Sequence, residues 1–493
     1  MDPVEVLRSR LGFPAFRPGQ EELIRAVLAG RDALGVLPTG GGKSVCYQLP
    51  AMMLGGVTVV VSPLVSLMQD QVGRARALGL RSQCLAAVQS EDERSSVLRS
   101  LRTRRLDLLF VSPERLSVAS FRHSMRGVQP ALIAVDEAHC ISEWGHDFRP
   151  AYRAIGGFRE GMSAPVLALT ASATPAVRRD VCTSLRLRRP ATVVHSFDRP
   201  NLWWAIDRVP RSGDRLEPLV RRVFRARGAG IVYAPTRNAV ERVRRRLSGA
   251  GISAESYHAG LPGAIRSSVQ RRFMEGTTRV VVATNAFGMG IDKPDVRFVA
   301  HLHMPTTLEA YYQEAGRAGR DGAPAVCWAY HARSDRRLGS RFIERTHPPE
   351  LRLRWLDSRL RRLAGRSRTL GCTDPRLPRA LGREVDEWRR GDALGVLAAL
   401  ERIGAIRGRG TLMLDGVSVH AELQLLERPN WFLSNHLRRS ALARLAAVEQ
   451  LARGRGCRRN HLLRYFGEFA ESGCGRCDRC GWDFGTGLPC PDG

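Results

Sequence analysis

Short runs of apolar, β-branched residues alternate with helix-length segments over the first two thirds of the chain. Runs that are apolar at every position are typical of strands buried on both faces, as in a parallel sheet covered by helices. The runs form two series separated near residues 196–201, which predicts two α/β domains with parallel sheets. The expected strands are Ala33–Leu37, Thr58–Val61, Asp107–Val111, Ala131–Val135 and Val166–Leu169 in the first series, and Gly230–Tyr233, Arg279–Ala283, Arg297–His301 and Ala325–Ala329 in the second.

The last third of the chain follows a different pattern. Between Arg333 and Arg368 there are twelve arginines against four acidic residues, which indicates a basic connector. Apolar residues then recur at helical spacing, and Gly404 is expected to end a helix. Two short apolar runs flank Asp415-Gly416, a two-residue hairpin signal. Helices followed by a small hairpin predict a winged-helix-like domain.

These patterns divide the chain into successive parts. A long helix is expected at about 433–453, and a group of cysteines follows it. The expected parts are the first parallel-sheet domain (1–205), the second parallel-sheet domain (206–335), the basic connector (336–370), the winged-helix-like domain (371–430), a helical hairpin with the cysteine module (431–485) and a tail (486–493).

The charge of the chain indicates a polyanionic partner. Basic residues number 77 against 48 acidic residues, which gives a formal net charge of +29. Codons rich in G·C could explain arginine in place of lysine but not the excess of positive charge, so nucleic acid is the simplest partner. No apolar stretch approaches about 18 residues, and the N-terminus lacks an apolar signal core, so we expect a cytoplasmic protein without membrane association.

One of only two lysines stands in a glycine-rich loop directly after the first expected strand. The loop is Pro38-Thr-Gly-Gly-Gly-Lys-Ser44, and the other lysine is Lys293. Glycines let backbone N–H groups approach phosphate oxygens, while Lys43 can reach the terminal phosphates and Ser44 can hold magnesium. Leu37 stands where the strict phosphate-loop pattern has its first glycine. Even so, the loop predicts a nucleoside triphosphatase.

Acidic residues at the end of a later strand fit the same chemistry. Asp136-Glu-Ala-His139 follows the strand expected at 131–135. Asp136 would hold the magnesium, directly or through water, and Glu137 would orient or deprotonate the attacking water. A solvated acidic strand end is the alternative interpretation, which the upstream phosphate loop disfavours.

A third group, Gln313-Glu-Ala-Gly-Arg-Ala-Gly-Arg320, lies in the second domain. Its Arg317 and Arg320 are three residues apart on one face of a turn or helix. Guanidinium groups that cross from an opposing domain stabilise charge on a transferring phosphoryl group. Two isolated arginines are usually a solvated basic face, but Gln313 and the glycines between them favour the functional interpretation.

Four cysteines near the C-terminus have the spacing of metal ligands. Cys457 is followed by Cys474-Gly-Arg-Cys477-Asp-Arg-Cys480. Four thiolates supply a tetrahedral zinc site, which contributes folding energy to this part of the chain more than catalysis. An iron–sulfur cluster is the alternative for four cysteines. Cys490 is expected to be a free thiol.

Several motifs occur along the chain in a fixed order. They are Phe16–Gln20, Pro38–Ser44, Ser62–Ser66, Ser112–Arg115, Asp136–His139, Cys140–Pro150, Thr170–Thr174, Ser196–Asn201, Ala283–Asp292 and Gln313–Arg320. In this order they resemble the superfamily-two helicases, and the Cys140–Pro150 and Ser196–Asn201 segments are similar to the RecQ family. The resemblance covers about residues 7–335 and 436–480. It implies an α/β fold with two tandem RecA-like domains, followed here by the winged-helix-like domain and a small helical zinc-binding module.

The order of the last two parts departs from the usual RecQ pattern. RecQ proteins usually place the zinc module soon after the second domain and the winged helix afterwards. In this chain the winged-helix-like segment comes first, which resembles a RecQ subgroup with that order. Whether the hairpin at Asp415-Gly416 splits a duplex is left open by this departure.

The resemblance implies ATP as the fuel, with magnesium, and assigns residues to the nucleotide. Phe13 would stack on adenine, while Arg17 and Gln20 would read the edge of the base. The remaining nucleotide-binding residues would be Thr39, Gly40, Gly41, Gly42, Lys43, Ser44, Gly290 and Asp292, and the catalytic residues Lys43, Asp136, Glu137, His139, Gln313, Arg317 and Arg320.

The same resemblance implies a path for single-stranded DNA. Trp144 and Phe148, followed by Arg149, would sense DNA and transmit its presence to the ATP site, since bases stack on aromatic faces whatever their sequence. Backbone phosphates would be held by Ser62, Ser66 and Ser112 in the first domain, and by Thr236, Arg237, Thr284 and Asn285 in the second.

The sequence therefore favours an ATP-dependent DNA helicase of RecQ type that moves 3′ to 5′ on single-stranded DNA and unwinds tailed duplexes in repair and recombination. One alternative is an RNA helicase, which the aromatic-rich loop and the cysteine module disfavour. Another is a non-catalytic DNA-binding or annealing factor, which would require a dead ATP site. We expect a monomeric, nucleoid-associated bacterial protein.

Overall fold

We describe the fold from a computed structural model of the chain. The chain forms two compact units: unit 1 comprises Met1–Ala332 and Leu451–Gly493, and unit 2 comprises Arg333–Gln450. Within the described part of the chain, no helix is both long and apolar enough to cross a membrane. The described residues are 2–38, 40–63, 65–86, 89–125, 127–143, 145, 148–210, 215–288, 293–371, 390–409, 412–414, 417–419, 422–470 and 473–482.

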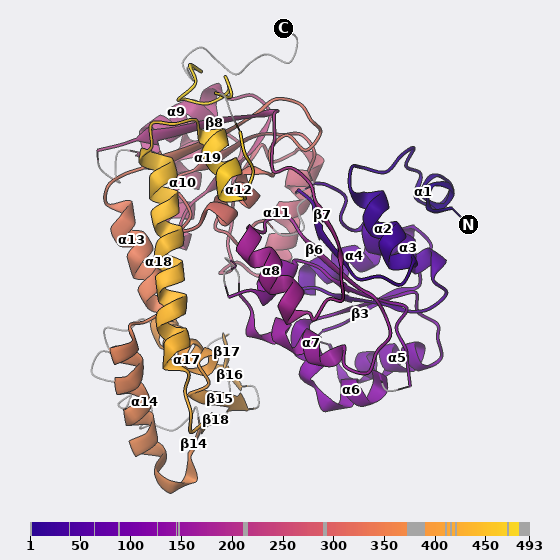
Figure 1. Ribbon diagram of the computed structural model, residues 1–493. Helices are drawn as coiled ribbons and strands as arrows, with labels where there is room; N and C mark the ends of the chain where they lie inside the picture. Colours follow the sequence, from indigo (N-terminus) through magenta and orange to yellow (C-terminus); the bar gives the residue numbers. More distant parts are fainter. Residues whose placement is uncertain are drawn as a thin grey trace. The chain divides into compact units, whose positions relative to one another are not determined.

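Unit 1 contains two parallel sheets, and the first has the strand order β3-β4-β2-β5-β6-β1-β7. Its side chains alternate between two buried clusters, one shared with α1–α4 and the other with α5–α8, so helices cover both faces (Figure 1). The strands are β1 (Ala33–Val36), β2 (Thr58–Val61), β3 (Ser82–Leu85), β4 (Leu108–Val111), β5 (Leu132–Val135), β6 (Val166–Thr170) and β7 (Ala191–Val194). The helices are α1 (Pro3–Leu11), α2 (Gln20–Leu28), α3 (Val45–Met53), α4 (Val65–Ala77), α5 (Glu91–Arg102), α6 (Ala119–Met125), α7 (Ala154–Phe158) and α8 (Pro175–Ser184).

The second sheet of unit 1 is also entirely parallel, with the order β10-β11-β9-β12-β13-β8. The predicted pair of parallel-sheet domains is thus confirmed. β8 pairs with β13, so the first domain ends before residue 202 and not at 205 as expected from the sequence. The strands are β8 (Leu202–Arg208), β9 (Ala229–Tyr233), β10 (Ala254–Tyr257), β11 (Val280–Ala283), β12 (Val296–His301) and β13 (Ala325–His331), and the helices are α9 (Leu216–Arg225), α10 (Arg237–Gly249), α11 (Gly263–Glu275) and α12 (Leu308–Ala315).

Unit 2 begins with two helices in the segment for which the sequence indicates a basic connector. They are α13 (Asp335–Thr346) and α14 (Glu350–Ala364). The apolar side chains of α14 enter a core with α17 (Arg390–Arg402), so this segment is folded structure rather than a linker. None of the arginines of α13 and α14 is buried, and a count of arginines alone therefore suggested a connector.

Unit 2 also contains two small antiparallel sheets. One has the order β14-β18-β15, and the other is the pair β16-β17, in which Leu412 is opposite Val419. The predicted hairpin strands therefore pair, although Asp415-Gly416 lies outside the described residues. Gly404 follows α17 with φ 71°, as expected of a helix stop. The strands are β14 (Thr369–Gly371), β15 (Ile406–Arg409), β16 (Leu412–Leu414), β17 (Val417–Val419) and β18 (Glu422–Leu425).

The chain returns to unit 1 through a long helix, α18 (Trp431–Arg453). Its observed bounds match the helix expected at about 433–453. The short helix α19 (Arg458–Tyr465) and the cysteine-containing loop then follow and belong to unit 1.

Candidate nucleotide site, nucleic-acid path and metal site

The glycine-rich loop lies between β1 and α3, where the first strand of the sheet meets a helix N-terminus. Gly40 and Gly42 have φ 82° and 71°, a left-handed backbone that disfavours other residues. A Cβ atom at Gly42 would also collide with the Gln20 side chain. Backbone N–H groups at a helix N-terminus attract anions, so this loop has the geometry of a phosphate site.

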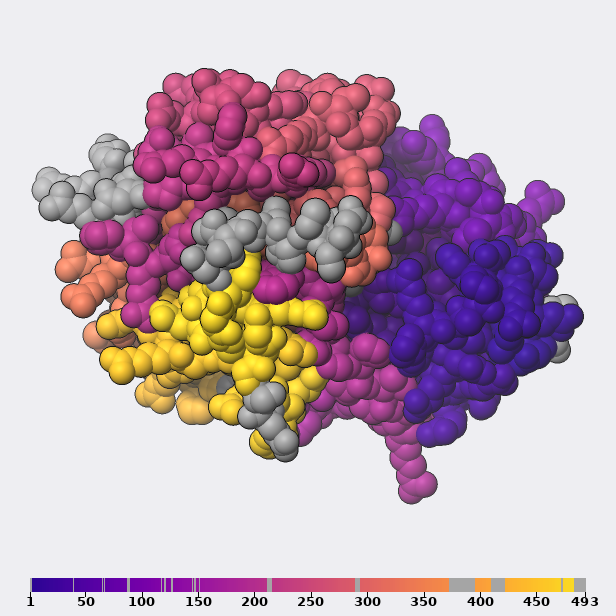
Figure 2. All heavy atoms as spheres, turned by 90° about the horizontal axis from the view of Figure 1, so that it is seen from above, coloured from indigo at the N-terminus to yellow at the C-terminus, as the bar shows by residue number. Residues whose placement is uncertain are grey.

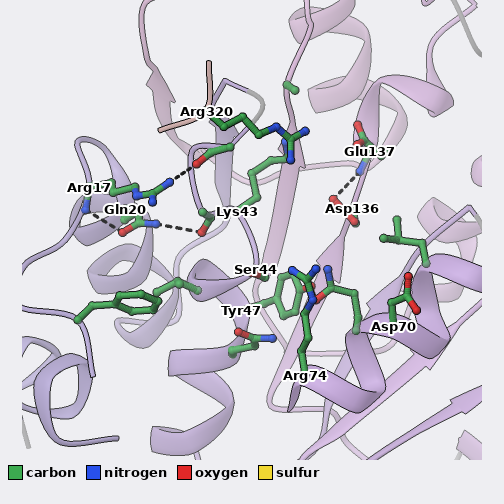
Figure 3. Close-up of a pocket in the computed structure, with 18 of the residues that line it drawn as sticks. Arg17, Gln20, Lys43, Ser44, Tyr47, Asp70, Arg74, Asp136, Glu137 and Arg320 are labelled. Atoms are coloured by element: carbon green, nitrogen blue, oxygen red, sulfur yellow. Dashed lines mark hydrogen bonds between the residues drawn. The ribbon is translucent and has the colours of Figure 1, made fainter. Parts of the chain in front are cut away.

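Arg17, which precedes α2, and Gln20, its first residue, hydrogen-bond to the glycine-rich loop. The Gln20 amide donates to the Gly42 carbonyl at 2.9 Å and accepts from the Arg17 backbone N–H at 2.8 Å. The Arg17 guanidinium donates to the Gly40 carbonyl, and Figure 3 shows both side chains reaching the loop. The residues expected to read the adenine edge therefore also fix the loop that would hold the phosphates.

A cavity of about 610 Å³ opens over this loop and is lined by both parallel-sheet domains. Phe13, which is 47% exposed, lies at its edge. Thr39, Gly290 and Asp292 of the predicted nucleotide set lie outside the described residues. Predicted residues that line the cavity are Phe13, Arg17, Gln20, Gly40, Gly42, Lys43, Ser44, Asp136, Glu137, Gln313, Arg317 and Arg320.

Two carboxylates reach the cavity from the end of β5. Glu137 has φ 47°, and its backbone N–H donates to the Asp136 carboxylate at 3.0 Å. Burial and the adjacent Glu137 charge raise the pKa of Asp136 to about 6. Asp136 and Ser44 thus present a carboxylate and a hydroxyl to one cavity, and such oxygen ligands suit magnesium.

A chain of polar contacts links these carboxylates to the opposite domain. His139 Nδ1 lies 3.3 Å from the Glu137 carboxylate and 3.0 Å from the Thr170 hydroxyl. The Thr170 hydroxyl accepts from the Ser172 backbone N–H at 3.3 Å, and the Gln313 amide donates to the Ser172 hydroxyl at 2.6 Å. These contacts therefore connect Gln313 of the second domain to Glu137 of the first.

The two predicted arginines line the cavity from the second domain. A Cβ atom at Gly40 would lie 3.5 Å from Arg320 Cγ, an ordinary van der Waals distance, so the Arg320 side chain lies beside the glycine-rich loop. Figure 3 shows the Arg320 and Lys43 side chains converging. Arg317 is buried and donates to the Gly288 carbonyl in its own domain.

The segment between the two sheets positions the turn that carries these arginines. The Arg199 guanidinium donates to the carbonyls of Gly316, Ala318 and Gly319 at 3.0–3.2 Å. The Asn201 amide donates to the Gly319 carbonyl at 2.8 Å. The interdomain segment is therefore bonded directly to the turn 316–319.

The predicted phosphate-contacting residues of the first domain follow neighbouring strands. Ser62 comes after β2 and Ser112 after β4, and Ser62 N–H donates to the Val111 carbonyl at 3.1 Å. Neither hydroxyl has a hydrogen-bond partner among the described residues. Both serines are buried at this edge of the sheet. The Ser66 side chain and Trp144 lie outside the described set.

The corresponding residues of the second domain occupy the equivalent position. Thr236 and Arg237 are exposed after β9, and Thr284 and Asn285 follow the adjacent β11. The Thr236 hydroxyl caps α10 by accepting from Ala239 N–H at 3.2 Å. The carboxyl ends of paired strands in each domain thus carry small polar side chains, as expected of a backbone-tracking path.

The aromatic-rich loop is described only in part. Phe148 is half-buried, with the Arg153 guanidinium 5.3 Å from its ring centroid. Arg149 donates to the Pro63 carbonyl at 2.8 Å, next to the segment after β2. The end of this loop is therefore tied to the predicted phosphate-contacting edge.

The four predicted cysteine ligands come together. The sulfur atoms of Cys457, Cys474, Cys477 and Cys480 all lie within 4.8 Å of one another. Backbone N–H groups of Arg458 and Arg476 point at two of these sulfurs, which favours the thiolate form of the ligands. A set of four sulfurs with such support fits zinc.

The cysteine module packs on the interdomain segment and on both parallel-sheet domains (Figure 2). The fully buried Phe466 stacks on Phe197 with ring centroids 4.3 Å apart. The Phe466 carbonyl accepts from Arg178 of the first domain at 2.6 Å, while the Tyr465 hydroxyl donates to Glu309 of the second at 2.8 Å. This module therefore joins the two halves of unit 1.

Several residues that line the cavity were not predicted from the sequence, among them Tyr47, Asp70, Gln71 and Arg74. The Tyr47 hydroxyl donates to the Gln71 side chain at 3.4 Å. Asp70 and Arg74 are four residues apart on α4, a spacing that places them on one helix face. This spacing was the one feature of the sequence that could have indicated these two residues, but exposed helices carry similar pairs without any function.

Metal removal should separate the zinc site from the nucleotide cavity. We expect one zinc ion per chain, and Cys477→Ser should lose it, because Cys477 is the fully buried ligand. Elemental analysis of purified protein provides the measurement, with Cys84→Ser as the matched control outside the cluster. Full zinc content in the Cys477→Ser protein would contradict the assignment.

A nucleotide cavity between two RecA-like parallel-sheet domains defines the class: a nucleoside-triphosphate-driven motor of the helicase type. Residues 17–181 match the DEAD/DEAH box helicase family, residues 215–322 the helicase conserved C-terminal domain and residues 425–481 the RecQ zinc-binding family. The chain belongs to the RecQ family of superfamily-two helicases. The match to the RecQ zinc-binding family assigns the four-cysteine cluster to zinc.

The sequence comparisons agree with this family. A Bacillus subtilis protein described as "Probable ATP-dependent DNA helicase RecS" is 36% identical over 493 residues, covering 97% of this chain and 92% of its own length. The ATP-dependent DNA helicase RecQ of Haemophilus influenzae is 45% identical over 334 residues, or 67% of this chain. The chain spans only 54% of that relative, and 52% of the Pasteurella multocida RecQ.

Solved structures support the fold alone. The DEAD-box helicase Mss116 bound to single-stranded RNA has a TM-score of 0.57 at 16% identity, covering 71% of this chain and 76% of its own. The Mycobacterium smegmatis helicase Lhr bound to single-stranded DNA has a TM-score of 0.54 at 20% identity, covering 90% of this chain and 62% of its own.

Proposed function

We propose that this chain is an ATP-dependent DNA helicase that moves 3′ to 5′ along single-stranded DNA and opens tailed duplexes in repair or recombination. The observation that carries the proposal is the shared cavity, in which Lys43 and Glu137 of one domain face Arg320 of the other. Both sides of the cavity come from one chain, so a single copy suffices. The polarity rests on family membership.

In this proposal the first domain binds the triphosphate and prepares the water. Lys43 and the backbone N–H groups of the glycine-rich loop hold the phosphates, and Phe13 contacts the base. Glu137 orients the attacking water and accepts its proton. Magnesium, held by Ser44 and Asp136, would neutralise phosphate charge.

The second domain supplies the remaining charge stabilisation and the coupling to DNA. Arg320 and Arg317 stabilise the charge that develops on the transferring phosphoryl group. Gln313 donates a hydrogen bond to Ser172. The contacts of Ser172 with Thr170, and of Thr170 with His139, couple closure of the cleft to the position of Glu137. Alternate closing and opening would move the two phosphate-contacting edges relative to each other along a strand.

Strand displacement on tailed duplexes tests this function. The chain should open a duplex with a 3′ tail and not one with a 5′ tail, and only with hydrolysable ATP. Its ATP hydrolysis should rise with single-stranded DNA much more than with RNA of the same sequence. Equal stimulation by RNA would favour an RNA helicase, and DNA binding without stimulated hydrolysis would favour a non-catalytic binding factor.

A further inference from the structure

Helix α14 of unit 2 carries an exposed face that the proposed motor does not use. Leu351 is 82% exposed and Trp355 is 42% exposed. They share one side of the helix with Ser358, Arg359 and Arg362, at spacings of three, four and seven residues. We call these five residues the Trp355 face. The opposite side, Leu353, Leu356, Leu360 and Ala364, is buried in the core of unit 2.

The Trp355 face combines an aromatic ring with positive charge. The Arg359 guanidinium lies 4.5 Å from the Trp355 ring centroid. Among the described residues, neither Arg359 nor Arg362 has a carboxylate within ion-pair distance. The Trp355 face therefore offers solvent an aromatic ring together with uncompensated positive charge.

The acidic residues of α14 do not cancel this charge. Glu350 pairs with Arg354 and also accepts from the Asn435 amide. Asp357 is buried and pairs with Arg361 at 2.8 Å. Both carboxylates therefore lie off the Trp355 face, which presents only positive charge to solvent.

We propose that the Trp355 face is an accessory binding site for single-stranded DNA, in which Trp355 stacks on an unpaired base and Arg359 and Arg362 contact adjacent phosphates. Stacking on an aromatic side chain tolerates any base, and the guanidinium groups match a polyanionic backbone. Paired bases keep their faces inside the duplex, so the exposed ring selects a single strand. This site rests on the proposed DNA helicase function and adds a contact outside unit 1.

Variants of the full chain with fluorescent oligothymidylate test the proposal. Trp355→Ala should weaken binding about 5- to 20-fold, while Trp355→Phe, which keeps a stacking ring, should retain most of the affinity. The double variant Arg359→Ala/Arg362→Ala should reduce the slope of log affinity against log salt by about 1.4, since each lost phosphate contact removes about 0.7. ATP hydrolysis without DNA should stay unchanged in all three proteins.

Arg336→Ala provides the matched control, because this exposed arginine of α13 is paired with Glu449. It should bind oligothymidylate with unchanged affinity and salt slope. Photocrosslinking of bromodeoxyuridine-containing oligonucleotide to the unsubstituted chain, with mapping by mass spectrometry, should label the peptide that contains Trp355.

Three results would overturn the site. They are unchanged oligothymidylate affinity in Trp355→Ala, equal losses in Trp355→Ala and Trp355→Phe, and a larger loss for blunt duplex than for oligothymidylate. If the unsubstituted chain binds DNA and shows DNA-stimulated hydrolysis while these variants behave like it, only the accessory site fails. If the unsubstituted chain itself lacks stimulated hydrolysis, the proposed motor function fails instead.

Discussion

Arg320→Ala should lower the kcat of DNA-stimulated ATP hydrolysis about a thousandfold or more. The side chain contacts the glycine-rich loop at Gly40 and lines the cavity from the opposite domain. A guanidinium that meets the phosphoryl group only in the closed cleft acts mainly in the transition state, so kcat should fall while the KM for ATP changes little. Steady-state kinetics at saturating single-stranded DNA give both constants.

Arg271→Ala is the matched control for this variant. Arg271 is exposed on α11 of the same domain, so its removal changes net charge equally without reaching the cavity. It should hydrolyse ATP at the unsubstituted rate. A normal kcat in Arg320→Ala, or equal losses in both variants, would remove Arg320 from the catalytic group.

Lys43→Ala should abolish ATP hydrolysis, with a loss of at least about 100-fold, while DNA binding remains. The Lys43 ammonium lies at the loop that would hold the phosphates. The other described residues of this loop carry no positive charge that could replace it. Hydrolysis assays and oligonucleotide binding by the same preparation provide the measurement. Intact hydrolysis would contradict the phosphate-loop assignment.

Lys43→Arg sharpens the same prediction. A chain that otherwise uses arginine almost everywhere retains lysine here, and a planar guanidinium does not fit the space of a point charge at the terminal phosphates. Lys43→Arg should therefore also fail to hydrolyse ATP. Unchanged zinc content in both variants would exclude misfolding of the cysteine module.

The central strands of both sheets could be predicted because they are buried on both faces. Continuous apolar runs such as Val280–Ala283 are typical of strands buried on both faces of a parallel sheet. The four strands of the parallel sheets that the sequence did not reveal, β3, β7, β8 and β10, are the outermost strands of those sheets. Edge strands are half-exposed and mix polar with apolar residues, as in Ala254–Tyr257, so their pattern resembles that of loops.

The chemical groups of the site were predictable because phosphate chemistry demands particular residues at fixed spacing. The residues that position them were not. Arg199 and Asn201 donate hydrogen bonds to backbone carbonyls of the turn 316–319. Because every residue has a backbone carbonyl, the sequence of the turn does not indicate that it accepts these bonds. The contacts of Phe466 with Arg178 and Tyr312 likewise depend on tertiary packing between segments that are far apart in the sequence.

The binding of a transition-state analogue tests the central claim, a cleft that Arg320 completes from the opposite domain, most directly. With single-stranded DNA present, the unsubstituted chain should bind ADP with aluminium fluoride far more tightly than ADP alone. Arg320→Ala should bind ADP equally well but lose that extra affinity, because only the transferring phosphoryl group needs the guanidinium. The same gain with aluminium fluoride in both proteins would contradict the account.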